Sequence, residues 1–159
     1  HRPRRGRAVT GRAVTYAIGI DLGTTNCALS FVTSAESPPR ALSVPQVVAP
    51  GEVAPRTLMP SFLYLPAEAQ FPPGSLSLAW YPNDRDVVGE LARSQGASTP
   101  ARLVSSAKSW LSHAGVDRRA EILPWRAPEG VPRVSPLQAS ARYLGHLRAA
   151  WEHAHPEAR

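Results

Sequence analysis

The chain has 159 residues, of which 43% are hydrophobic and 19% charged, a composition that fits one globular domain with a buried core. It contains no apolar run of about 18 residues, which excludes a membrane-spanning helix, and no signal-peptide segment behind the basic N-terminus. The single cysteine, Cys27, excludes an internal disulfide. We therefore expect a cytoplasmic protein with no membrane partner.

The formal net charge of +6 belongs mainly to the N-terminus. Five arginines and no acidic residue occur within residues 1–15, and the rest of the chain carries a net charge of +1. A basic segment with so few apolar side chains is typical of a disordered tail, so a nucleic-acid partner is disfavoured. Because the chain begins with His1 and its only methionine is Met59, this disordered leader could precede the native start.

Residues 16–32 predict a β-hairpin, because apolar residues alternate with small or polar ones on both sides of a short turn. The alternating positions are Tyr16, Ile18 and Ile20 before the turn and Cys27, Leu29 and Phe31 after it. Cys27 thus lies within a strand, where we expect it to act as a small buried hydrophobe.

The turn of this hairpin carries chemistry suited to a polyphosphate. Asp21 ends the first strand, Gly23 lets the backbone approach a ligand without a Cβ, and Thr24, Thr25 and Asn26 follow. Successive backbone N–H groups in a turn form an anion-binding nest, and a nearby carboxylate can hold hydrated Mg²⁺. The turn therefore predicts a site for phosphate oxygens and Mg²⁺.

Residues 38–83 hold most of the prolines and predict small hairpins rather than a wide central sheet, because proline confines strands to edges and bulges. Gly and Pro separate the short apolar runs of this region into strands and turns. The expected strands are Val44, residues 46–49 and residues 61–65, with turns at Pro50-Gly51 and Pro66, and an edge strand at Leu76, Leu78 and Trp80.

Three helices are expected in the second half of the chain. The first covers residues 87–95 and ends at Gly96. The second covers residues 101–112, with Thr99 as its cap and Pro100 at its first position.

The third helix has the strongest signal, a capping box at Ser135 and Gln138 with Pro136 at the first helical position. It is expected to run for about twenty residues to Pro156. Its apolar face is predicted to comprise Leu137, Ala141, Leu144, Leu147 and Trp151.

Five segments of the chain together resemble one protein family. The first, residues 19–28, reads Gly-Ile-Asp-Leu-Gly-Thr-Thr-Asn-Cys-Ala, and the others are residues 56–62, 88–92, 105–111 and 134–136. In sequence and order they are similar to the nucleotide-binding domain of the seventy-kilodalton heat-shock chaperones, which are actin-like ATPases. The resemblance covers about residues 16–155.

The resemblance implies an α/β fold, the first lobe of an actin-like (ribonuclease H-like) ATPase, with a proline-rich hairpin region and three helices. Residues 16–159 would form this partial nucleotide-binding domain. The second lobe and the peptide-binding domain are expected to be absent from the chain.

The resemblance also implies roles for the hairpin turn. Backbone N–H groups of Gly23, Thr24, Thr25 and Asn26 would bind phosphate oxygens, and Asp21 would bind Mg²⁺ through water. ATP or ADP with Mg²⁺ are thus the expected cofactors.

Lys108 is the only lysine of the chain, and it borders the apolar stripe of the second expected helix. That position suits a surface lysine whose stem lies along the protein, and it equally suits an ammonium that reaches a cleft. One lysine retained among so many arginines indicates that a compact ammonium is needed there. The resemblance places the catalytic lysine of the family at Lys108, where it would act together with Asp21.

The implied function is that of the N-terminal part of an ATP-dependent molecular chaperone. ATP binding and hydrolysis would be coupled to the binding of unfolded client polypeptides, with co-chaperones also acting through the missing domains. The fragment alone is expected to be inactive. Three alternatives remain open: a small-molecule, sugar-type kinase of the same superfold, an ATP-sensing regulator or scaffold without turnover, and a basic nucleic-acid binder.

Some residues depart from the family pattern. Ser109 and Trp110 follow Lys108, where the common branch of the family has arginine directly after the lysine. Residues 66–86 are longer and richer in proline than usual. These departures point to a divergent bacterial branch.

Overall fold

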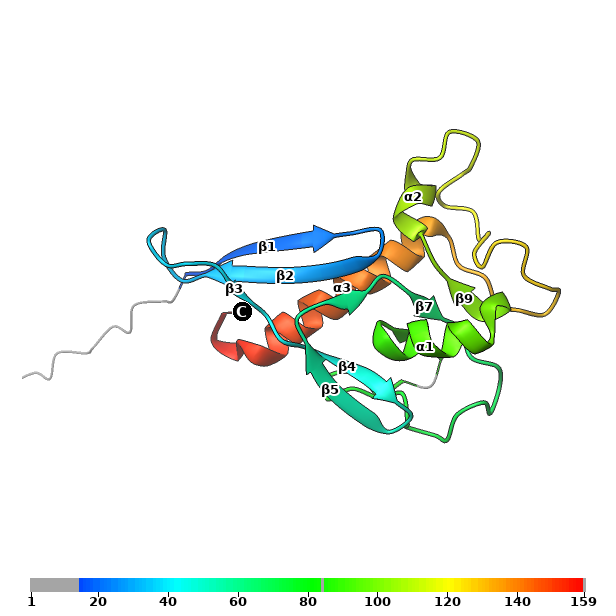
Figure 1. Cartoon of the computed structure of the whole chain (residues 1–159), viewed down its shortest axis with the longest axis horizontal. Helices are drawn as coiled ribbons and strands as arrows, with labels where there is room; N and C mark the ends of the chain where they lie inside the picture. The colour runs from blue at the N-terminus through cyan, green and yellow to red at the C-terminus, as the bar shows by residue number, and fades with distance from the viewer. Residues whose placement is uncertain (1–14, 84, 159) are drawn as a thin grey trace, which may run out of the picture.

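The computed structural model describes residues 15–83 and 85–158, so the basic leader apart from Thr15 lies outside the described residues. Within them the chain forms three small antiparallel sheets and three α-helices (Figure 1). This architecture agrees with the expected α/β class, whereas the actin-like assignment stays a prediction.

The predicted hairpin of residues 16–32 is confirmed. β1 (Ala17–Leu22) pairs antiparallel with residues 27–32 of β2 (Asn26–Val32), and a three-residue turn joins the two strands. On its other side β2 pairs with two short strands, β3 (Arg40–Ala41) and β6 (Met59–Pro60).

The two strands of the hairpin differ in burial. Cys27, Leu29 and Phe31 are buried, as the alternation of β2 predicts. Ile18 and Ile20 are 45% and 47% exposed, although they lie opposite buried residues of β2. The reason is that β1 is an edge strand, which pairs only with β2 within the described part of the chain.

The proline-rich region forms small sheets, as expected. β4 (Val44–Ala49) and β5 (Glu52–Arg56) make a hairpin around Pro50-Gly51, where Gly51 adopts a φ of +78° that favours glycine. In the third sheet β7 (Leu63–Tyr64) pairs with β8 (Val87–Val88) on one side and with β9 (Leu103–Val104) on the other.

The first helix starts and ends later than predicted. α1 covers Glu90–Ser98. The two valines predicted to start it form β8 instead, and Gly89 between them and α1 adopts a non-helical φ of +92°. Gly96 does not end the helix. A Cβ at Gly96 would lie 2.5 Å from the side chain of Leu103, so this glycine allows α1 to pack closely against the chain that follows.

The predicted helix over residues 101–112 is wrong in length. The segment divides into a 3₁₀ turn at Pro100–Arg102, then β9, then the short helix α2 (Ala107–Leu111). Leu103 and Val104 pair with β7 instead of continuing the helix, and Ser106 adopts a left-handed φ of +55° before α2. Tertiary pairing thus overrides a helical pattern of apolar residues.

The last helix is confirmed. α3 covers Pro136–Ala154 and begins with the predicted capping box. The Gln138 backbone N–H donates to Ser135 Oγ at 3.0 Å, and the Ser135 N–H donates to Gln138 Oε1 at 2.7 Å.

Two of the five residues predicted for the apolar face of α3, Leu147 and Trp151, are buried. Leu137 and Leu144 are 46% and 38% exposed, and Ala141 is exposed as well. The residues that face the core are Ala139, Tyr143, Leu147, Ala150 and Trp151. Both sets repeat at three- and four-residue spacing, so periodicity alone does not decide which stripe is buried.

The main core lies between the hairpin sheet and α3, which runs alongside it in Figure 1. The rings of Phe31 and Trp151 meet edge to face with their centroids 5.1 Å apart, and Tyr16 packs against both. A second cluster joins the other two sheets to α1 and consists of Val47, Tyr64, Leu76, Val87, Leu91 and Ala92.

The expected edge strand at Leu76, Leu78 and Trp80 is wrong. Leu78 and Tyr81 instead exchange two backbone hydrogen bonds of 3.0 Å, which close a tight turn. The turn places Trp80 against α3, where its ring contacts that of His146. Aromatic packing on the helix thus replaces strand pairing.

His146 connects α3 to β4. Its Nε2 lies 2.8 Å from the carbonyl oxygen of Pro45, to which a ring N–H can donate. Burial lowers the pKa of His146 below its ordinary value of 6.5, and the hydrogen bond to Pro45 opposes this effect. The folded chain therefore resists protonation of this ring.

This pKa shift predicts that the free energy of unfolding falls as the pH falls. Below about pH 6.5 the unfolded chain binds a proton at His146 that the folded chain does not, which favours unfolding. Denaturant unfolding at about pH 7.5 and about pH 5.5 measures the loss.

The variant His146→Gln keeps an N–H donor but cannot titrate, so it should lose less stability over this range than the native chain. His113→Gln, the same change at an exposed histidine, is the matched control. An equal loss in the native chain and in His146→Gln would contradict the assignment.

Candidate functional site

The turn at the end of the β1–β2 hairpin accepts two hydrogen bonds from one serine, Ser61. We call residues 23–26 the hairpin tip. Ser61 follows β6 and is 3% exposed. Its Oγ donates to the carbonyl oxygen of Gly23 at 2.8 Å, and its backbone N–H donates to the carbonyl oxygen of Thr25 at 2.9 Å. These two bonds fix the tip at both of its sides.

The thiol of Cys27 completes this arrangement. Cys27 Sγ lies 3.1 Å from Ser61 Oγ. Because the hydroxyl proton of Ser61 is directed to Gly23, the thiol is the donor to the serine oxygen. The two side chains therefore form a buried chain of hydrogen bonds that ends on the backbone of the tip.

Gly23 is required by the close approach of the backbone within the tip. A Cβ at this position would lie 2.1 Å from the carbonyl oxygen of Asn26, a contact that no side-chain movement can relieve. Gly19, on the strand before it, has room for a Cβ, whose nearest neighbour would be Ser30 Oγ at 3.5 Å. The tip thus needs glycine at residue 23 for steric reasons.

The tip presents free hydrogen-bond donors to solvent. Thr24 and Thr25 are exposed, whereas Gly23 and Asn26 are half-buried. Within residues 15–83 and 85–158, no protein group accepts a hydrogen bond from the backbone N–H of Thr24 or Thr25. Two hydroxyls and two N–H groups are therefore available together to an anion.

The two predicted charged groups lie at the same end of the hairpin. Burial raises the pKa of the Cys27 thiol most; the Asp21 carboxylate raises it further and the Lys108 ammonium lowers it. Both charges are thus near this thiol. Lys108 belongs to α2, which packs against α3.

Asp21 and Lys108 are both exposed and available to a ligand. Neither makes an ion pair or a hydrogen bond through its side chain among the described residues. Asp21 lies opposite Ala28 in the register, so its side chain is on the face of the hairpin away from Cys27. The carboxylate and the tip therefore share an open surface rather than the core.

The residues suit a phosphate group with a hydrated metal ion better than a directly bound metal. No group of three or more His, Cys, Asp or Glu side chains in the described part of the chain is placed to hold a metal ion. A single carboxylate beside free N–H groups fits Mg²⁺ held through water and phosphate oxygens.

Sequence reasoning found the tip, Asp21 and Lys108 but assigned no role to Ser61. The signal was present, because Ser61 lies in the segment of residues 56–62 that supports the family resemblance. The sequence could not show that this segment forms β6, which pairs with β2 and brings Ser61 into hydrogen-bond contact with the tip.

No protein-family model matches the chain, and no curated protein matches its sequence. The relation to the heat-shock chaperones therefore stays a prediction from the motif residues. None of the described helices is long and apolar enough to cross a membrane.

The two glycines of the hairpin provide a matched pair of substitutions. Gly23→Ala forces the tip to shift and should lower the free energy of unfolding by about 1–3 kcal/mol, the usual cost of overpacking. Gly19→Ala should change it by less than about 0.5 kcal/mol, because its Cβ makes an ordinary contact. Urea unfolding measures both, and equal effects would show that the tip is not sterically constrained.

Proposed function

We propose that the hairpin tip binds the phosphate groups of Mg²⁺·ATP and that this chain is the first lobe of a chaperone ATPase. The proposal rests on the glycine turn that Ser61 fixes by hydrogen bonds. The backbone N–H groups of Thr24 and Thr25 in this turn have no acceptor among the described residues. A fixed turn with free N–H groups binds an anion without first losing conformational entropy.

The residues around the tip have different roles in binding and hydrolysing ATP. N–H groups and hydroxyls of Thr24 and Thr25 would hold phosphate oxygens, and Asp21 would hold Mg²⁺ through water. Lys108 offsets negative charge on the terminal phosphate and orients the attacking water. Phosphoryl transfer depends mainly on such positioning and electrostatic stabilisation, so no covalent role is assigned to a side chain.

The coupling of hydrolysis to client binding rests on the family resemblance. It would involve a second lobe and a peptide-binding domain, through which unfolded polypeptides and co-chaperones act. The exposed side chains of Ile18 and Ile20 on the edge strand β1 support a fold in which a further element covers this strand.

Replacement of Lys108 tests the proposal in the full-length ATPase. Lys108→Ala should lower single-turnover hydrolysis of ATP by about 10²–10³, the usual loss when one preorganised electrostatic group is removed. ATP binding should persist, because the hairpin tip is intact.

Lys108→Arg is the matched control for charge. It keeps a cation but not a compact ammonium, so it should recover only part of the rate. Unchanged turnover in Lys108→Ala would refute the catalytic role. ATP binding with no hydrolysis in the native protein would instead support a sensor without turnover.

A further inference from the structure

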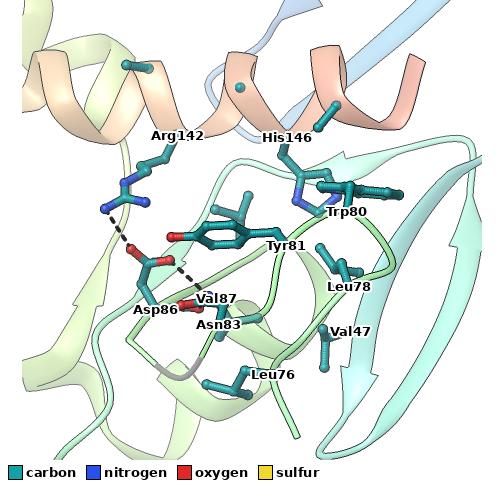
Figure 2. Close-up of a pocket in the computed structure, with 14 residues that line it drawn as sticks. Val47, Leu76, Leu78, Trp80, Tyr81, Asn83, Asp86, Val87, Arg142 and His146 are labelled. Atoms are coloured by element: carbon teal, nitrogen blue, oxygen red, sulfur yellow. Dashed lines mark hydrogen bonds and ion pairs between the residues drawn. The ribbon is translucent and has the colours of Figure 1, made fainter. Parts of the chain in front are cut away.

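A second candidate site lies beside α3, independent of the hairpin tip and of the proposed function. A cavity of about 320 Å³ opens between α3 and residues of the segments 76–83 and 86–88. We call it the α3 cavity, and Figure 2 shows the side chains that converge on it. Its volume falls in the lower part of the range of small-molecule sites, which is about 300–1,000 Å³.

The helix keeps this cavity open by means of a glycine. Gly145 lies in the middle of α3, where glycine is the least favourable residue other than proline. Its φ is not positive, and a Cβ added there would meet no atom within 4 Å. The fold therefore does not need this glycine. Ala141 and Ala149, one turn away on each side, also line the cavity with small side chains.

Two aromatic residues form the opposite wall. Trp80 and Tyr81 belong to the tight turn closed by the paired backbone hydrogen bonds between Leu78 and Tyr81. The ring of Trp80 meets that of His146 nearly perpendicularly, with centroids 5.6 Å apart. The turn and this ring contact fix flat apolar surfaces against which a planar molecule can pack.

A polar group lies at each end of the α3 cavity. At one end, the buried Asp86 accepts from Arg142 at 3.1 Å and from Asn83 Nδ2 at 3.3 Å. Arg142 is half exposed, and no group among the described residues accepts from its remaining N–H donors, which are therefore available to an anion. Figure 2 shows Arg142 and His146 both descending from α3 toward the cavity.

His146 supplies the other end. Its Nε2 carries the proton that is donated to the carbonyl oxygen of Pro45, which leaves Nδ1 as an acceptor. Burial lowers the pKa of His146, so the ring is neutral near pH 7 and keeps this acceptor. Arg142 and His146 are four residues apart on one helix face, about 5–6 Å between Cβ atoms, a span that one small ring system can bridge.

We propose that the α3 cavity binds a small planar aromatic carboxylate, with its ring between Trp80, Tyr81 and the small residues of α3. The carboxylate pairs with the free N–H groups of Arg142. A ring N–H donates to Nδ1 of His146. At residue 145, any side chain larger than that of glycine would occupy the space of the ring.

Indole-3-carboxylate is the probe, and its binding to the whole chain is followed by protein NMR. We expect resonances of residues that line the cavity to shift in the native chain. Gly145→Leu should weaken the affinity at least about tenfold, because the leucine fills the cavity. Arg148→Leu adds the same side chain to an exposed position of α3 outside the cavity and should bind as the native chain does.

The melting temperature of Gly145→Ala and the affinity for indole are two further measurements. Gly145→Ala should raise the melting temperature, because alanine favours the helix and meets no neighbour; a lower melting temperature would show that the fold needs the glycine and would overturn the proposal. Indole without the carboxylate should bind more weakly than the probe. No binding of the probe to the native chain, or equal binding to Gly145→Leu, would also overturn it.

Discussion

The candidate phosphate site depends on the buried hydroxyl of Ser61. The hydroxyl accepts a hydrogen bond from the thiol of Cys27 and donates one to the carbonyl oxygen of Gly23. The backbone N–H of Ser61 donates to the carbonyl oxygen of Thr25. A turn exposed to water would otherwise populate many conformations. Because Ser61 lies in the core, the packing of the sheet and the shape of the tip are coupled, and loss of either weakens the other.

The electrostatics at this end of the molecule follow from the same arrangement. The Cys27 thiol stays protonated because burial raises its pKa, so the hydrogen-bond chain through Ser61 persists at neutral pH. Asp21 lies on the open face of the hairpin, and the ammonium of Lys108 on α2 lowers the pKa of the Cys27 thiol. The charged groups are thus free for a ligand, while the groups that position the turn are uncharged and buried.

The sequence was sufficient where local signals agreed with the fold. Alternation and the glycine turn identified the hairpin, and the capping box at Ser135 located α3. It failed where tertiary pairing competed with local pattern: Leu103 and Val104 look helical but pair with β7, and Gly96 looks like a helix end but packs against Leu103. The support of the tip by Ser61 arises from a contact 38 residues distant in sequence, which no local pattern encodes.

A titration of isotope-labelled protein with Mg²⁺·ATP, followed by NMR, tests the proposed phosphate site most directly. Binding by this chain should be weak, with a Kd on the order of 1 mM, because only one side of the phosphates is contacted. The amide signals of Thr24 and Thr25 should shift most, and Gly23→Ala should remove these shifts while Gly19→Ala keeps them. Shifts centred elsewhere, or none at saturating nucleotide, would contradict the proposed site.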